Sequence, residues 1–233
     1  MTFSNWSRLA SVALLLLLTL ANRATAQPAR DLASFVDPFI GTGPAPSATY
    51  GQEFDGGDVF PGAAYPSGML AWSPDTVEHK LPGGYFYPDH SIKGFSLTHF
   101  SGRGCTVYQD VPIMPINGTI GVSPRVQPAV ATFAHANESA EPGAYRVSLD
   151  DGIQVEFSAT PRTGIGVVTF PKDGTLLVDA AGSVNDVFDS SVAIDPQTQM
   201  VTGFVDAQVG CGLDHYTLYF AIAFDQPFAS YGT

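Results

Sequence analysis

The chain has 233 residues and a formal net charge of −12, with 10 basic against 22 acidic side chains. This balance argues against nucleic acid and against an anionic membrane surface, because no surplus of lysine and arginine is available to neutralise phosphates. The 24 glycines and 18 prolines are too many for long helices to dominate, so we expect short elements joined by turns.

The first 26 residues have the layout of a secretory signal peptide. Arg8 precedes the apolar run 12–20, and small residues surround Ala26. That run is about half as long as a membrane-spanning helix. We predict cleavage near Ala26 and a secreted or periplasmic mature domain over 27–233 with no membrane segment. An uncleaved N-terminal anchor is the alternative.

The segment 37–115 is rich in glycine and proline, a composition also typical of disorder. It carries many aromatic side chains as well, and each can bury about 150–250 Å². A solvated linker would not carry so much apolar surface. We therefore expect ordered, tightly turned loops between short strands, and such loops are where function tends to lie.

The second half of the chain alternates apolar and polar residues. Ile153, Val155 and Phe157 alternate with polar neighbours, which is the period of a half-buried strand. Turn sequences at 150–152 and 171–174 separate successive segments. We predict strands over 144–149, 153–157, 164–170, 175–179, 200–209 and 215–224. Strands at this spacing indicate an antiparallel β-sandwich.

Three serines in the aromatic loops are candidate nucleophiles, namely Ser67, Ser96 and Ser101. None of them stands in a G-x-S-x-G sequence, and no strand-turn-helix pattern follows. His99 lies two residues from Ser101, but a loop serine beside a structural histidine is the favoured interpretation.

Metal-binding patterns are weak. An acidic group in a Gly-rich loop could offer oxygens to calcium, and a solvated turn is the favoured alternative; it comprises Glu53, Asp55 and Asp58. Asp186 and Asp189 form a weaker pair. The histidines of the front half have no cysteine nearby, which disfavours zinc; they are His79, His90 and His99.

Cys105 and Cys211 are the only cysteines. Export would permit a disulfide between them, which would close a loop of about a hundred residues. Two small buried thiols are equally compatible with the sequence.

A carbohydrate site fits the front half better than the other chemistries. A neutral sugar needs flat apolar surfaces for its C–H faces and converging polar groups for its hydroxyls. Aromatic, Gly-rich loops with interspersed Asp, His and Asn supply both. Aromatic residues of a sandwich core would give the same pattern.

A series of short segments occurs in a specific order: 36–42 (VDPFIGT), 59–64 (VFPGAA), 66–69 (PSGM), 73–76 (SPDT), 84–85 (GY), 92–102 (IKGFSLTHFSG), 104–105 (GC), 114–115 (MP), 138–140 (ESA), 142–145 (PGAY) and 160–162 (TPR). In this order and spacing the set resembles the N-terminal domain of the family 92 glycoside hydrolases, which are exo-acting α-mannosidases. The resemblance covers most of the mature chain.

The resemblance implies a galactose-mutarotase-like antiparallel β-supersandwich that packs against a C-terminal (α/α)-barrel. Family members are inverting, calcium-dependent enzymes whose catalytic acid, base and most calcium ligands come from the barrel, and we expect that barrel to lie outside this chain. We therefore expect no catalytic residue and no metal ligand here. The substrate-binding positions that the resemblance transfers are Phe39, Gly41, Thr42, Asp75, Thr76, His99 and Gly102.

The chain departs from the family pattern in the pocket loops. Val77 stands where arginine is common, 78–83 lacks the usual tryptophan, and Leu97 and Val107 replace polar residues. These differences concern the specificity for sugar and linkage rather than the fold.

Together with the predicted signal peptide, the resemblance thus implies the N-terminal part of a secreted exo-α-mannosidase that acts on mannose-containing N-glycans in glycoprotein catabolism. The chain alone should be inactive, since general acid–base catalysis would depend on the barrel. The alternatives are a stand-alone carbohydrate-binding module and a truncated relic that docks to a barrel partner.

Overall fold

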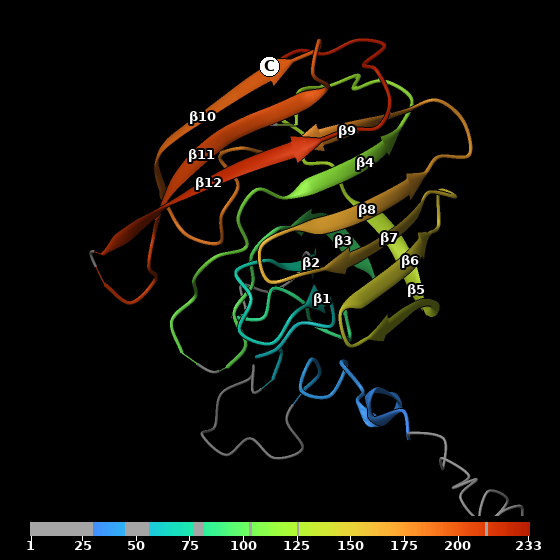
Figure 1. Ribbon diagram of the computed structural model, residues 1–233, viewed down its shortest axis with the longest axis vertical. Helices are drawn as coiled ribbons and strands as arrows, with labels where there is room; N and C mark the ends of the chain where they lie inside the picture. Colours follow the sequence, from blue (N-terminus) through green and yellow to red (C-terminus); the bar gives the residue numbers. More distant parts are fainter. Residues whose placement is uncertain (1–29, 45–55, 77–81, 103, 125, 213) are drawn as a thin grey trace, which may run out of the picture. The chain divides into compact units, whose positions relative to one another are not determined.

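The computed structural model describes residues 30–44, 56–76, 82–102, 104–124, 126–212 and 214–233 (Figure 1). The chain divides into residues 1–35, which contain the short 3-10 helix η1 (Leu32–Phe35), and residues 36–233, which contain every described strand. The predicted signal peptide lies outside the described residues. Among the described residues, no helix combines the length and the apolar character needed to cross a membrane.

The strands of the second unit are β1 (Ala63–Ala64), β2 (Ala71–Thr76), β3 (Ser91–Ser96), β4 (Ile113–Asn117), β5 (Ala131–Glu141), β6 (Ala144–Leu149), β7 (Gln154–Ala159), β8 (Gly164–Thr169), β9 (Gly174–Val178), β10 (Val187–Asp195), β11 (Met200–Gln208) and β12 (His215–Ala223). All of their pairings are antiparallel. The prediction of an antiparallel β-sandwich is confirmed.

Two sheets make up this unit. The larger follows the order β1-β2-β3-β5-β6-β7-β8, and β4 joins it beside β3 and carries β9 on its other edge. The smaller sheet has the order β10-β11-β12 and is drawn in orange and red in Figure 1. In that view it lies beside the β4–β9 pair.

The six strands expected in the second half correspond to β6–β9, β11 and β12, with boundaries shifted by at most two residues. Strand β10 was not predicted. Asp189, Ser190 and Ser191 interrupt its alternation, and its register with β11 shifts between Val187 and Asp189. Such a bulge breaks the period of two on which the prediction relies.

Each sheet buries one apolar cluster. In the larger sheet the indole of Trp72 stacks on Phe157 with 4.8 Å between ring centroids and an interplanar angle of 12°. A Cβ on Gly164 or Gly166 would come within about 3.1 Å or 2.6 Å of that indole, so these glycines of β8 allow β2 and β8 to approach. In the smaller sheet Val201 and Val205 face a second cluster that includes Val111. Because β2 and β3 are antiparallel, the loop that precedes β2 and the loop that follows β3 lie at the same end of this pair.

Candidate functional site

An open cleft of about 460 Å³ lies among the loops that flank β1, β2 and β3. Its size is within the usual range for small-molecule pockets. The side chains of Tyr65 and Phe100 stand at its surface with 53% and 43% of their area exposed. The other described lining residues are Phe60, Ala64, Pro66, Ser67, Gly68, Ala71, His99, Ser101 and Pro142. Its lining is thus mainly aromatic and small, with two serine hydroxyls.

A tight turn shapes one wall of the cleft. The amide of Gly68 donates to the carbonyl of Tyr65 at 2.8 Å, and Ser67 adopts a φ of +61°. A non-glycine residue in the left-handed region is uncommon and is often found at a functional site. This turn presents the Tyr65 ring to solvent.

His99 forms the buried part of the cleft and is held at both ring nitrogens. Nδ1 lies 2.8 Å from the carbonyl oxygen of Ala71, and Nε2 lies 3.0 Å from Oδ1 of Asp75. The carbonyl can only accept, so Nδ1 carries a proton and donates it to Ala71. The contact between Nε2 and Oδ1 also needs a proton, which is bound to one of these two atoms. The hydroxyl of Ser96 donates to Oδ2 of Asp75. The Phe60 ring packs beside the imidazole at 5.2 Å between centroids.

Gly84 leaves the space in which this pair forms. Its φ is +75°, and a Cβ there would lie 2.7 Å from Oδ1 of Asp75 and 2.9 Å from the ring of His99. Its carbonyl also accepts from the amide of Thr76 at 2.9 Å. Glycine is therefore required by both the backbone angle and the close approach.

A second buried carboxylate lies behind the first. Asp110 accepts from the hydroxyl of Thr98 at 2.8 Å and from that of Tyr216 at 3.0 Å. Burial raises the pKa of Asp110 above its usual value, although its hydrogen bonds act in the opposite direction. Burial and the nearby Asp110 charge raise the pKa of Tyr216. Because Tyr216 belongs to β12, this contact links the smaller sheet to the loop behind the cleft.

The loop that carries Asp110 has strained backbone. Tyr108, Gln109 and Val111 adopt φ values of +73°, +57° and +53°. A branched side chain in this region is a genuine outlier, so the surrounding contacts must hold the loop.

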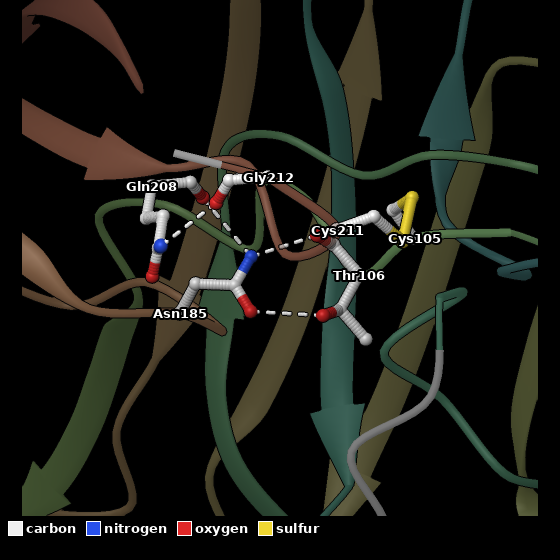
Figure 2. Close-up of a disulfide and its surroundings, with 6 residues drawn as sticks. All are labelled: Cys105, Thr106, Asn185, Gln208, Cys211 and Gly212. Carbon is white, nitrogen blue, oxygen red and sulfur yellow. Dashed lines mark hydrogen bonds between the residues drawn. A yellow bond between two sulfur atoms is a disulfide. The ribbon is translucent and has the colours of Figure 1, made fainter. Parts of the chain in front are cut away.

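The disulfide anchors one end of that loop (Figure 2). Cys105 and Cys211 are joined, with 5.2 Å between their Cα atoms. Beside the disulfide, Nδ2 of Asn185 donates to the carbonyls of Thr106 and Gln208 at 2.7 Å and 3.0 Å. Figure 2 shows the Asn185 side chain between these two segments. Of the two alternatives open for the cysteines, the structure contains the disulfide.

The structure brings together Asp75 and His99 among the residues transferred by resemblance. Thr42 and Thr76 are fully buried. The hydroxyl of Thr42 donates to the carbonyl of Phe39 at 2.8 Å, and that of Thr76 accepts from the amide of Phe86 at 3.0 Å. The hydroxyls of these two threonines therefore bind backbone groups within the described residues.

The remaining three transferred residues lie in turns. Phe39 packs edge-on against Tyr87 with 5.8 Å between centroids. Gly41 has a φ of +89°, and Gly102 has a φ of +127° and donates its amide to the carbonyl of Asp58 at 2.7 Å. The exposed rings of Tyr65 and Phe100 are not among the residues that the sequence singles out. The signal that could have found them is their position in the aromatic, turn-rich loops.

The other candidate chemistries find little support. Ser67 and Ser101 line the cleft, whereas Ser96 is buried against Asp75. Within the described ranges, no group of three or more His, Cys, Asp or Glu is placed to hold a metal ion. Three residues of the predicted acidic and histidine groups lie outside the described residues, namely Glu53, Asp55 and His79.

The comparisons with known proteins agree with the antiparallel β-sandwich. The family model described as the glycosyl hydrolase family 92 N-terminal domain matches residues 35–233. The chain belongs to this family.

Individual relatives cover most of the chain. The chain is 24% identical over 222 residues to a protein of Arthroderma benhamiae described as an uncharacterized secreted glycosidase. The aligned region covers 86% of this chain and 26% of that protein. A family GH92 α-mannosidase from Bacteroides thetaiotaomicron superposes with a TM-score of 0.72 at 28% identity, covering 84% of this chain and 26% of that one. A family GH92 inverting mannosidase from the same species gives 0.68 at 30% identity, covering 84% and 25%. The chain thus spans about a quarter of the length of these relatives.

Proposed function

We propose that this chain is the N-terminal part of a secreted exo-α-mannosidase that acts on mannose-containing N-glycans, and that it contributes loops to the substrate pocket. The cleft carries the proposal: two exposed aromatic rings, Tyr65 and Phe100, flank small and hydroxyl-bearing residues. Flat apolar faces pack against sugar C–H surfaces, and hydroxyls such as that of Ser101 can bind sugar hydroxyls. The membership of the family and the mannosidase relatives support mannose as the sugar.

In this proposal the catalytic acid and base lie on a C-terminal (α/α)-barrel. An inverting glycosidase needs two carboxyl groups about 6.5–9.5 Å apart across the scissile bond. The described lining of the cleft contains no aspartate or glutamate, and Asp75 is buried behind His99. The chain alone is therefore inactive in this proposal, and its role is to bind and orient the glycan.

Calcium belongs to the proposal as the cofactor of the complete enzyme. The described residues do not fit a calcium site, because they offer no group of three or more acidic or histidine ligands. Its ligands are accordingly assigned mainly to the C-terminal barrel, outside this chain.

Calorimetry with mannose and α-mannobiose, with and without calcium, tests the proposal. We expect weak binding by the chain that is lost in Tyr65→Ala and Phe100→Ala and retained in Tyr219→Ala, whose ring is 77% exposed on the smaller sheet. Binding unaffected by the two cleft substitutions would contradict the cleft as the sugar site. Release of mannose by the chain alone would contradict the assignment of catalysis to the barrel. Tight binding of mannose without hydrolysis, by this chain and by any longer form of the protein, would favour the stand-alone binding module.

A further inference from the structure

Strand β5 carries His135, one of whose ring nitrogens is buried without a hydrogen-bond partner among the described residues. Nδ1 of His135 donates to Oε1 of Glu138 at 2.6 Å. The carboxylate only accepts, so the proton resides on Nδ1 and the lone pair of the neutral ring is on Nε2. Nε2 is buried and makes no hydrogen bond within the described residues. A buried polar atom without a partner is unusual and calls for an explanation.

The carboxylate that orients His135 is itself rigidly held. The side chain of Glu138 is 1% exposed, and it also accepts from the hydroxyls of Tyr85 and Tyr145, each at 2.6 Å. Burial, together with the Glu138 charge, raises the pKa of both tyrosines, so they remain donors. Metal-ligating histidines almost always donate their other ring N–H to a carboxylate, a backbone carbonyl or water, and Glu138 is such a partner for Nδ1 of His135.

A β-bulge produces this arrangement. In a regular strand, residues three apart point to opposite faces. The register of β5 with β6 shifts between Phe133 and Glu138, and the extra residues allow His135 and Glu138 to meet. Bulges occur preferentially where a side chain is redirected next to a functional site.

A second histidine ring lies at a separation from His135 that is compatible with a shared metal ion. The rings of His90 and His135 have centroids 5.0 Å apart and are tilted by 50°. Two imidazoles that bind one tetrahedral zinc ion at about 2.0–2.1 Å place their centroids roughly 5 Å apart. His90 is exposed, and its ring makes no hydrogen bond with any described residue, so it is able to turn towards an ion.

The ring contacts of His135 fix the plane of its imidazole. Tyr87 stacks on the face of His135 with 4.1 Å between centroids and an interplanar angle of 12°. Phe133 meets it edge-on at 5.3 Å. A metal binds in the plane of the imidazole, so stacking on its face orients the ring without competing for Nε2.

We propose that His90 and His135 form a two-histidine site for a divalent transition metal of the zinc type, with Glu138 as the orienting carboxylate. Imidazole nitrogen favours zinc, nickel and copper over calcium. Two protein ligands leave the remaining coordination positions to water or to an added ligand. This site is separate from the cleft and does not depend on the proposed mannosidase role.

Titration of the untagged, metal-free chain with zinc chloride tests the site, using preparations that unfold cooperatively on heating. We expect saturation at one ion per chain, and affinity at least about tenfold weaker in His90→Asn and in His135→Gln. Calcium chloride at the same concentration should not compete. Because His90 is exposed, His90→Asn should fold normally and keeps the test decisive even where His135→Gln destabilises the chain.

His215→Gln is the matched control. His215 also directs Nδ1 to a carboxylate, with Oδ1 of Asp206 at 2.6 Å, but its aromatic neighbour is Phe188 and not a second histidine. Zinc affinity should be unchanged in this variant. The absence of saturable binding by the wild-type chain, retention of full affinity in His90→Asn, or loss of affinity in His215→Gln would each overturn the proposal.

Discussion

Nε2 of His99 lies 3.0 Å from Oδ1 of Asp75, although 24 positions separate the two residues in the chain. Both side chains are nearly inaccessible to solvent. The contact joins the end of β2 to the loop that follows β3, and the antiparallel pairing of these strands brings the two segments together. The imidazole that closes the bottom of the cleft is therefore positioned by a carboxylate that cannot itself reach a ligand in the cleft.

Replacement of Gly84 by alanine should lower the free energy of unfolding by more than the backbone angle alone would cost, because the added Cβ would also displace Asp75 and His99. A left-handed alanine costs about 1–2 kcal/mol, and here its Cβ would also approach Asp75 and His99 within 3.0 Å. Gly118→Ala is the control, since Gly118 has a φ of +74° with nothing within 4 Å of the added Cβ. Urea denaturation should show a clearly larger loss of unfolding free energy for Gly84→Ala. Equal losses would mean that the close approach adds no cost.

Replacement of both Cys105 and Cys211 by alanine should lower the unfolding free energy by about 2–5 kcal/mol, because the bond constrains a long loop in the unfolded chain. The sequence separation that it closes is 106 residues. Denaturation of the wild-type chain in a reducing buffer should give the same midpoint as the double variant. If the wild-type midpoint did not differ between oxidising and reducing buffers, the disulfide would not contribute to stability.

The hydroxyl of Tyr216 should contribute to the link between the sheets. It donates to the Asp110 carboxylate and accepts from the amide of Tyr108 at 3.1 Å. Tyr216→Phe leaves these buried groups short of a partner, which should cost about 1–3 kcal/mol. Tyr219→Phe on the same strand removes a solvent-exposed hydroxyl and should change stability little. Thermal unfolding of the two variants measures the difference, and a Tyr219→Phe loss as large as that of Tyr216→Phe would refute the assignment.

Alkaline pH should unfold the chain through its buried tyrosines. The pKa values of Tyr85, Tyr145 and Tyr216 are raised in the folded state, first by burial and then by carboxylate charges. Their stabilising contribution is complete below the ordinary tyrosine pKa of about 10 and is lost as the pH rises above it, because only the unfolded chain then ionises readily.

Absorbance at the tyrosinate band and circular dichroism measure this together. The three buried tyrosines should ionise only as the β-sheet signal disappears, whereas exposed rings such as Tyr219 should ionise earlier. Ionisation of all tyrosines in one step before any loss of the sheet signal would be inconsistent with the buried carboxylate contacts.

The predicted strands of the second half agree with the structure because their side chains alternate between a buried and an exposed face. Strand β7 shows this directly, with Val155 and Phe157 buried and Glu156 exposed. Strand β10 and the bulge in β5 could not be predicted in the same way. Their polar runs and register shifts depend on partner strands, which local periodicity does not report.

The sequence alone determined the class of the fold, the family and the position of the aromatic loops, because strand periodicity, turn residues and motif order are local properties of the chain. Only the tertiary structure decided that Thr42, Thr76 and Asp75 are internal supports, that Tyr65 and Phe100 face solvent, and that His90 approaches His135. These facts depend on strand pairing and burial, which bring together residues far apart in the chain and decide which side chains water can reach.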